Sequence, residues 1–318
     1  MKNIKAFSTL LLTGGLFTVL LGSCNQSGSK GPSDTPTSGS IKISVDETFK
    51  PIIETQLNVF HKLYKNAKIN ATYAAESEAI KALLQDSARL AIVSRPLTPS
   101  ETQVFEKARI TPRVTKIATD GIALILNPEN TDTLLSLPQL REIFSGKATS
   151  WKQVNPASKL GNIAIVFDNA NSSTARFVRD SITNKAPLPP TAYASNSIPS
   201  VIDYVTENKN SIGVIGANWI SDFDDSTAVG FINKVKVVAV SREHTPAKPD
   251  NYVQPYQAYL VQKSYPLFRE VYIISREARA GLGTGFVSFS AGDKGQRIVL
   301  KAGLAPARGV VRLVEVKR

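Results

Sequence analysis

Cysteine and histidine are scarce in this chain of 318 residues, which has one cysteine, Cys24, and two histidines, His61 and His244. A single cysteine excludes an intramolecular disulfide and a cysteine-rich metal site, so the apolar core alone must hold the fold together. The two histidines share no ligand motif, and we expect no metal site. There is no Gly-x-Ser-x-Gly sequence either, which argues against a serine hydrolase with a nucleophile elbow. We therefore expect no enzyme, no cofactor and no metal.

The apolar stretch Phe7–Leu21 follows a short basic region and is too short for a comfortable membrane span. It ends in Leu-Gly-Ser-Cys, and this beginning of the chain resembles a bacterial lipoprotein signal peptide with its lipobox. The resemblance implies that residues 1–23 are removed and that Cys24 becomes the lipidated first residue. A signal-anchor helix retained in the membrane is the alternative. Residues 24–40, rich in Gly, Pro and Ser, predict a flexible tether.

The resemblance to a lipoprotein implies a protein of the cell envelope, anchored by lipid on the extracytoplasmic side, which is the periplasm in a Gram-negative cell. The formal net charge of +12 suits an anionic partner. The basic residues are dispersed, with no run of five or more and no nucleic-acid motif, so we expect no nucleic-acid partner. The charge therefore favours a small anionic ligand.

Apolar residues alternate between strand-like and helix-like spacing along the chain, which predicts an α/β fold with mostly parallel strands. Ligands of such sheets bind outside the carboxyl ends of the strands. The expected strands are 41–45, 69–73, 90–93, 114–126, 163–167 and 211–216, and the expected helices are 49–64, 77–84, 137–144, 198–207 and one from about residue 99.

Small polar residues follow the apolar run 163–167 and precede a helical pattern, which predicts a strand, a loop and a helix N-terminus. The free N–H groups of a helix N-terminus favour negative charge, and Ser172, Ser173 and Thr174 could add hydroxyl donors. Together they would form a site for a small oxyanion. An ordinary N-cap is the alternative, because Ser, Thr and Asn are the preferred capping residues.

Several phrases in a fixed order resemble one family, the phosphate-binding proteins of ABC transporters. They are Asp120-Gly-Ile-Ala-Leu-Ile-Leu-Asn-Pro128, Gln139-Leu-Arg-Glu-Ile-Phe-Ser-Gly-Lys147 with Trp151, Ser172-Ser-Thr174 with Phe177-Val178, Ser211-Ile-Gly-Val214, Tyr265-Pro-Leu267, Gly295-Gln-Arg-Ile-Val299 and Gly303-Leu-Ala-Pro306.

The resemblance implies a two-lobed periplasmic-binding-protein fold of type II, each lobe a mixed sheet flanked by helices, with a two-strand hinge. Lobe 1 would comprise 41–126 and part of 246–318, and lobe 2 would comprise 127–245. The extended crossovers would lie near Leu126–Asn127 and near 240–258. An anion would bind between the lobes, which would close around it. The implied function is capture of inorganic phosphate and its delivery to an ABC permease in the membrane, by a monomer.

The family's binding residues carry over onto matching positions. Ser172, Ser173 and Thr174 match its phosphate-binding loop, and Ser77 matches a serine at the start of the second helix. Thr48 and Phe49 match a hydroxyl-containing first loop, with the register uncertain by one residue.

Two positions depart from the family pattern. Arg95 stands where the family commonly has an aspartate, and Asp168 stands where it has an arginine. A hydrogen phosphate site needs a cation and a carboxylate that accepts the ligand's proton, so an exchanged Arg95–Asp168 pair could preserve both. Separate surface or capping residues are the alternative.

The first loop also departs, because Asp46 and Glu47 precede Thr48, and carboxylates beside a bound anion would weaken its binding unless they are neutralised. A sensor or interaction module of the cell envelope, with the same fold and with weak or no phosphate binding, is therefore the alternative function.

Overall fold

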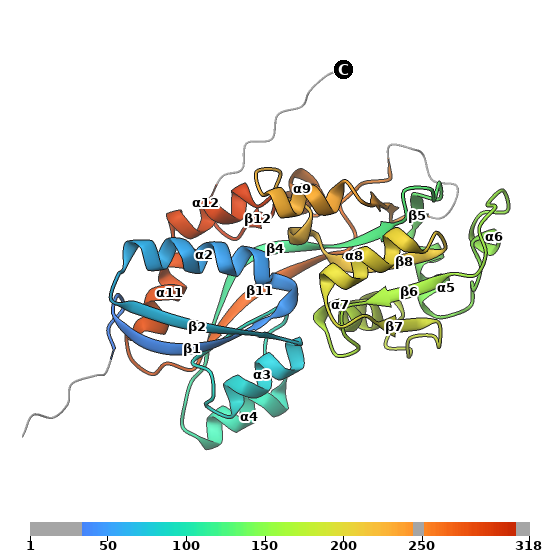
Figure 1. Ribbon diagram of the computed structural model, residues 1–318. Coiled ribbons are helices and arrows are strands. Elements are labelled where there is room, and N and C mark those ends of the chain that lie inside the picture. Colours follow the sequence, from blue (N-terminus) through green and yellow to red (C-terminus); the bar gives the residue numbers. More distant parts are fainter. Residues whose placement is uncertain (1–33, 244–250, 310–318) are drawn as a thin grey trace, which may run out of the picture. The chain divides into compact units, whose positions relative to one another are not determined.

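One mixed sheet of ten strands organises the residues that the computed structural model describes, 34–243 and 251–309. Its order is β2-β1-β3-β11-β4-β8-β6-β7, and β12 and β9 pair with the long strand β4 (Arg113–Leu126) (Figure 1). The first part of β4 pairs with β11, and residues 122–126 pair with β8. We define lobe 1 as residues 34–121 and 268–309, and lobe 2 as residues 122–243 and 251–267.

Lobe 1 contains three parallel strands, β2-β1-β3, joined to antiparallel β11 and β4. Its core is rich in phenylalanine, and the rings of Phe60 and Phe286 meet edge to face at 5.5 Å. Its elements besides β4 are β1 (Gly39–Asp46), η1 (Glu47–Phe49), α2 (Lys50–Leu63), β2 (Ala67–Ala74), α3 (Glu76–Leu84), β3 (Leu90–Val93), α4 (Pro99–Lys107), β11 (Phe268–Ser275), α11 (Leu282–Ala291), α12 (Asp293–Lys301) and β12 (Ala305–Pro306).

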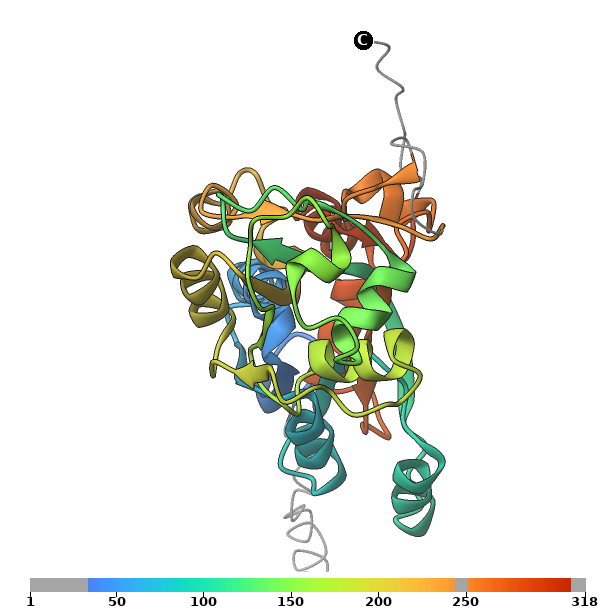
Figure 2. The same ribbon diagram turned by 90° about the vertical axis from the view of Figure 1, so that its right-hand side faces the viewer.

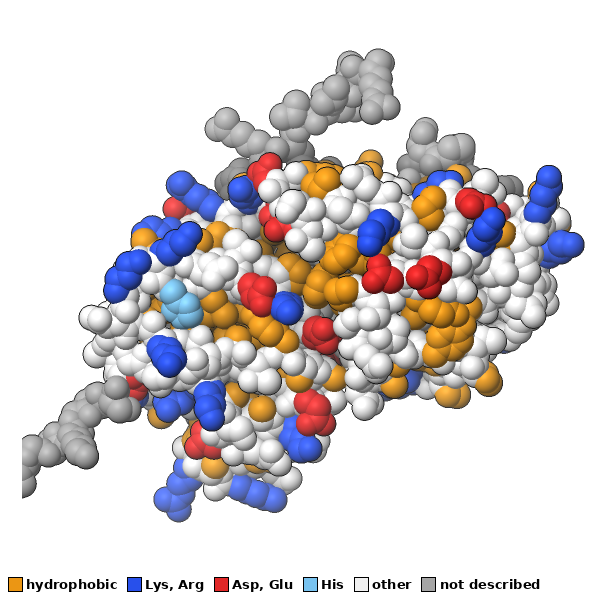
Figure 3. All heavy atoms as spheres, viewed as in Figure 1, with side chains coloured by type: hydrophobic (Ala, Val, Ile, Leu, Met, Phe, Trp, Pro, Cys, Tyr) orange, Lys and Arg blue, Asp and Glu red, His pale blue; other side chains and the backbone are white. Residues whose placement is uncertain are grey.

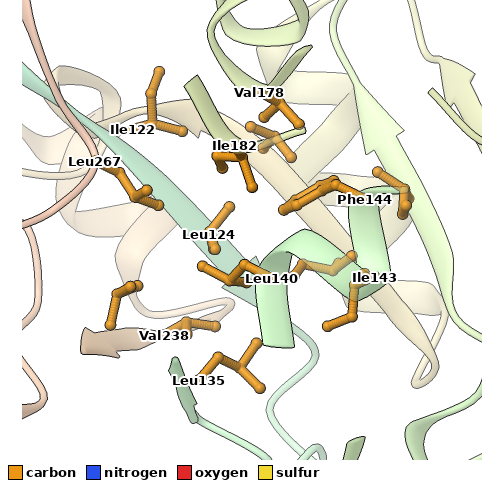
Figure 4. Close-up of a cluster of buried hydrophobic side chains, with 14 of the residues drawn as sticks. Ile122, Leu124, Leu135, Leu140, Ile143, Phe144, Val178, Ile182, Val238 and Leu267 are labelled. Carbon is orange, nitrogen blue, oxygen red and sulfur yellow. The ribbon is translucent and has the colours of Figure 1, made fainter. Parts of the chain in front are cut away.

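Lobe 2 repeats the mixed arrangement, because parallel β6, β7 and β8 join antiparallel β4. Aliphatic side chains from β4, α5 and η2 form one of its cores (Figure 4). Its elements are β5 (Leu134–Ser136), α5 (Leu137–Phe144), α6 (Trp151–Val154), β6 (Ala164–Phe167), α7 (Ser173–Phe177), the π-helical turn η2 (Val178–Ile182), β7 (Ala192–Ala194), α8 (Ile198–Glu207), β8 (Ser211–Gly216), η3 (Ala217–Trp219), α9 (Ser226–Ile232), β9 (Lys236–Val237), β10 (Ala239–Ser241) and α10 (Gln257–Val261).

Local sequence signals explain where several helices begin. Helix α4 starts with a capping box in which the Thr98 hydroxyl accepts the Glu101 N–H and the Glu101 carboxylate accepts the Thr98 N–H. Helix α5 has the same arrangement between Ser136 and Gln139. Both helices carry proline in the first turn, where its missing N–H has no helical partner to lose. These boxes fix the ends of the two helices from sequence-local contacts alone.

The chain crosses between the lobes at two adjacent points. Strand β4 changes partner between Gly121 and Ile122, and the Ile122 N–H donates to the Leu267 carbonyl at 2.8 Å. The first crossing therefore lies at 121–122 rather than at 126–127, because β4 continues unbroken until the Asn-Pro turn. The second lies at 267–268, since Leu267 packs in the core of lobe 2 and β11 begins at the next residue.

We expected this second crossing near 240–258, and the structure has it further along the chain. Residues Gln257–Val261 form helix α10, whose Leu260 is buried in the core of lobe 2. Burial of Leu260 against β4 explains the helix, because the segment reaches the sheet as a packed cover and not as a strand. The part 244–250, which includes His244, lies outside the described residues.

The start of the fold also differs from expectation. Strand β1 begins at Gly39, and Asp34 is buried, with its carboxylate accepting the Leu282 N–H at 2.8 Å. Residues 34–40 therefore belong to lobe 1, because Asp34 satisfies a free N–H at the start of α11. The proposed signal peptide, Cys24 and the first part of the tether lie outside the described residues.

Candidate inter-lobe anion site

The loop between β6 and α7 has the predicted strand, loop and helix arrangement. Ser172 is the N-cap of α7, and its hydroxyl accepts the Ala175 N–H at 3.2 Å and donates to the Asn169 carbonyl at 2.7 Å. The Thr174 hydroxyl lies 2.8 Å from that of Ser172 and donates to Asp168 at 2.7 Å. The N-cap interpretation of Ser172 is thus correct. It does not exclude an anion site, because the hydroxyl of the next residue, Ser173, takes no part in the cap and contacts Thr48 and Arg269.

Ser173 makes its contacts across the lobe boundary. Its hydroxyl lies 3.2 Å from Thr48 Oγ1, and it accepts a hydrogen bond of 2.6 Å from Nη1 of Arg269. Thr48 belongs to η1, whose first turn Asp46 caps by accepting both the Thr48 N–H and its hydroxyl. Hydroxyl groups from both lobes and one guanidinium therefore meet at a single point. Figure 2 turns the ribbon so that the elements of lobe 2, drawn in green and yellow, face the viewer.

Arg269 is the buried cation of this region. Its Nε and Nη2 donate to Asp120 Oδ2 at 3.0 and 2.8 Å, and its guanidinium carbon lies 4.6 Å from the centre of the Phe49 ring. Arg269 and Asp120 are cross-strand partners on β11 and β4, directly beside the hinge. The pair holds the guanidinium in place while Nη1 remains directed toward Ser173. Phe49 thus contributes a ring face against the cation.

Three aspartates of this region, Asp46, Asp120 and Asp168, have raised pKa values. Burial, reinforced by the charge of Glu76, raises the pKa of Asp46 to about 7, although Arg269 opposes the shift. Burial also raises the pKa of Asp168 and of Asp120. Protonation of Asp46 removes a negative charge from the first loop, so this acidic loop is compatible with anion binding.

A cavity of about 200 Å³ lies at Ser172, the residue that precedes Ser173 in the loop. Its lining includes three of the predicted binding residues, Ser77, Arg95 and Ser172, together with Glu76 and Arg176. Ser77 is exposed on the first turn of α3. The predicted residues thus fall into two neighbouring groups, one around this cavity and one in the buried cluster with Thr48, Ser173 and Arg269.

Of the two alternatives for Arg95 and Asp168, the structure shows separate residues and no pair. Arg95 donates to both carboxylate oxygens of Glu101 at 2.8 Å, and Asp168 accepts from Thr174 instead. The reason is local, because Glu101 lies six residues from Arg95 and is already oriented by the capping box of α4. Hydrogen bonds from Arg95, together with those from Thr98, lower the pKa of Glu101 to about 2, although its partial burial opposes the shift.

Comparison with known proteins agrees with this architecture. Residues 30–294 match the model of the PBP superfamily domain. The chain belongs to the PBP superfamily. It is 28% identical over 284 residues to the phosphate-binding protein PstS of Staphylococcus aureus, a match covering 88% of this chain and 82% of that protein. The sequence-based resemblance to phosphate-binding proteins is therefore confirmed.

Two solved structures show the same fold. One is a putative phosphate ABC transporter substrate-binding protein from Clostridium perfringens with bound phosphate, with a TM-score of 0.70 and 24% identity over 85% of this chain and 100% of that chain. The other is an ABC-type phosphate transport receptor from Vibrio cholerae, with a TM-score of 0.63 and 23% identity over 83% of this chain and 99% of that chain. The two-lobed fold expected from the sequence is confirmed.

In this member of the superfamily, four residues of the region were missed by sequence reasoning: Asp120, Arg269, Glu76 and Arg176. Asp120 interrupts an otherwise apolar stretch of β4, and Arg269 lies in a strand that also carries Val271 and Ile273. A charged residue inside an apolar strand is the signal that could have indicated Asp120 and Arg269, because burying a charge requires a partner. The pairing of these two residues depends on strand register, which the sequence does not show.

Two residues outside the candidate site, His61 and Trp151, make hydrogen bonds within the fold. His61 Nε2 accepts the Ile69 N–H at 3.1 Å, and Trp151 donates to the Asn210 carbonyl. Within residues 34–243 and 251–309 we find no group of His, Cys, Asp or Glu side chains suited to holding a metal ion. In the same described residues, no helix combines the length and hydropathy needed to span a bilayer.

Proposed function

We propose that this protein binds inorganic phosphate between its lobes and delivers it to an ABC permease. The observation that carries the proposal is the meeting of Thr48 from lobe 1 and Ser173 from lobe 2 beside the guanidinium of Arg269. Hydroxyl donors from two hinged halves and a fixed cation are suited to a small oxyanion, which would close the lobes as it binds. The names of the similar proteins from Staphylococcus aureus and Clostridium perfringens support phosphate as that anion.

The binding residues we assign are those expected from the sequence: Thr48, Phe49, Ser77, Arg95, Asp168, Ser172, Ser173 and Thr174. We add Arg269 as the cation, because Arg95 is held by Glu101 whereas Nη1 of Arg269 already contacts the hydroxyl cluster.

Buried carboxyl groups favour phosphate over sulfate in this proposal. Hydrogen phosphate can donate its proton to a carboxylate such as Asp168, whereas sulfate carries no proton at neutral pH and would be repelled. Asp168 is 2% exposed, so repulsion from an unprotonated carboxylate would be poorly screened. The site would therefore select by protonation as well as by size.

The rest of the proposal concerns location. Lipidation at Cys24 would hold the protein at the outer face of a membrane, where a monomer could pass phosphate to permease subunits. The contact of Asp34 with α11 would attach the tether to lobe 1. Metabolic labelling with a radioactive or clickable fatty acid, compared with a Cys24→Ala variant, tests the anchor; label retained in the variant would contradict it.

Isothermal titration of the purified protein tests phosphate binding. The protein is unfolded and refolded first to strip bound anion, and sulfate serves as the control ligand. We expect phosphate to bind and sulfate not to bind. Thr174→Val removes the hydroxyl that contacts Asp168, and Ser173→Ala removes the one shared between lobes; each should weaken binding at least tenfold, since each deletes a hydrogen bond at a charged group. Absence of heat with both anions would contradict the proposal and favour an envelope sensor.

A further inference from the structure

Arg176 connects the two lobes through a carboxylate that no expected function uses. This residue of α7 in lobe 2 donates from Nε to Glu76 Oε2 at 2.5 Å and from Nη2 to Ser94 Oγ at 2.7 Å. Glu76 begins α3 and Ser94 follows β3, so both partners belong to lobe 1. The contact lies at the wall of the 200 Å³ cavity that Ser77 and Ser172 also line.

Glu76 is held as a bound anion would be. Its Oε1 accepts the Ser94 N–H and the Ser94 hydroxyl, both at 2.7 Å, and its side chain is almost fully buried. Although burial acts in the opposite direction, Arg176 and Ser94 hold the pKa of Glu76 below its usual value. A charged carboxylate therefore occupies backbone, hydroxyl and guanidinium donors in the lining of this cavity.

We propose that Glu76 is an internal competitor for the bound oxyanion and that its pair with Arg176 closes the lobes when no anion is present. This inference rests on the proposed function only for the identity of the competing anion. Binding then exchanges one carboxylate for one phosphate oxygen at Arg176. Glu76 thus determines affinity, because the ligand must displace an intramolecular partner and because a closed, unliganded receptor lowers the population open to the ligand.

Loss of the contact between Glu76 and Arg176 in a variant should have an effect large enough to measure. The pair joins a side chain with 3% exposure to one with 22% exposure, so solvent screens it only partly. Charge-assisted hydrogen bonds of this type are among the stronger contacts between side chains. Removing the charge of Glu76 while keeping its shape should therefore open the ligand-free protein.

Trp219 provides an intrinsic reporter of lobe closure. Its Nε1 in lobe 2 donates to the Thr48 carbonyl in lobe 1 at 2.9 Å, and its side chain is buried. In the full chain solubilised in detergent, Trp151→Phe leaves Trp219 as the single tryptophan, since the sequence has two. Opening of the lobes should expose the indole and shift its emission to longer wavelength.

The test compares Glu76→Gln with Glu78→Gln in this background. Glu78 lies on the same helix but is exposed, and it forms an ion pair with Lys81 at 3.4 Å. We expect Glu76→Gln to shift the tryptophan emission of the ligand-free protein to longer wavelength. Adding inorganic phosphate should return the emission toward its original wavelength. The variant should also bind phosphate on the order of tenfold more tightly. Glu78→Gln should change neither property. Arg176→Gln, which breaks the contact from the other lobe, should give the same shift without phosphate.

Unchanged ligand-free emission in both Glu76→Gln and Arg176→Gln, in proteins with native circular dichroism, would overturn the closing role. Phosphate affinity that stays equal or falls in Glu76→Gln would overturn the competition. If neither the parent protein nor any of these variants binds phosphate, the proposed function fails. The comparison of ligand-free emission still decides whether the Glu76–Arg176 pair closes the lobes.

Discussion

The buried pair beside the hinge allows a quantitative test of the site's electrostatics. Arg269 and Asp120 have side chains that are 3% and 0% exposed, and they share two hydrogen bonds. Replacing Arg269 with Met keeps much of the volume but leaves Asp120 without a cation. Removing one partner of a buried pair costs about 3–5 kcal/mol, because the remaining charge is neither solvated nor compensated. We expect Arg269→Met to lower the free energy of unfolding by that amount.

A second substitution separates loss of the pair from loss of packing. Adding Asp120→Asn to Arg269→Met removes the stranded charge, so the double variant should recover about 2 kcal/mol or more relative to Arg269→Met alone. Urea unfolding at pH 7, followed by far-ultraviolet circular dichroism, gives the four free energies of the cycle. The matched control is Arg297→Met, whose partner Asp293 lies one helical turn away on the exposed face of α12. This control should cost less than about 1 kcal/mol.

Additivity would refute the reasoning. If the losses from Arg269→Met and Asp120→Asn sum to the loss of the double variant within about 0.5 kcal/mol, the two side chains are not coupled. The cation would then be held by its stacking on Phe49 and its bond to Ser173. A slope against urea that differs strongly among the variants would indicate a change in the unfolding transition, and the comparison would then use midpoints of ligand-free thermal unfolding.

Three further predictions concern particular positions. Burial, together with the charge of Glu76, raises the pKa of Asp46 to about 7 from an ordinary 3.8, so the folded state keeps a proton that the unfolded chain loses. Asp46 therefore makes stability fall as pH rises from about 4 to 7. Asp46→Asn should flatten that fall in a plot of Tm against pH. A Cβ at Gly213 would lie 2.8 Å from side-chain carbons of lobe 2, so Gly213→Ala should cost about 1–3 kcal/mol in urea unfolding, whereas Gly230→Ala, in open space on α9, should be neutral or stabilise by up to about 1 kcal/mol; equal effects would contradict the packing argument. Asp34→Ala should cost about 1 kcal/mol and speed proteolysis near the start of lobe 1, and an unchanged cleavage rate would show that the contact with α11 does not hold this segment.

The sequence alone predicts most elements of this fold, because their signals are local. Helix α2 at Lys50–Leu63 and strand β3 at Leu90–Val93 lie where periodicity indicates. The serine-threonine loop is also predictable, since hydroxyl residues after an apolar strand both cap a helix and supply donors. The predicted position of the hinge is five residues beyond the observed one. The Asn-Pro turn after Leu126 marks the end of β4, whereas the change of strand partner at Gly121 has no local signal.

The charged partners of the site could not be predicted from local patterns. The sequence left open whether Arg95 pairs with Asp168 across the cleft. The capping box of α4 presents Glu101 six residues away, and a preformed carboxylate needs no ordering of a distant segment. Glu76 and Arg176 are 100 residues apart, and only the folded arrangement brings them to bond distance. Sequence reasoning thus predicted the hydroxyl residues of the candidate site, but it missed Arg269 and Arg176 and their carboxylate partners Asp120 and Glu76.

Assignment of each contact to one or two lobes indicates which contacts the hinge can break. Arg269 and Asp120 are cross-strand neighbours at the hinge itself, so their pair should survive lobe opening. The bonds of Ser173 to Arg269 and Thr48 join different lobes and must break. Opening therefore frees one guanidinium nitrogen and the Ser173 hydroxyl without stranding a charge, because Asp120 continues to compensate Arg269. At Arg269, opening therefore breaks a hydrogen bond and no ion pair, and the guanidinium offers an entering anion a donor whose orientation is already fixed by Asp120.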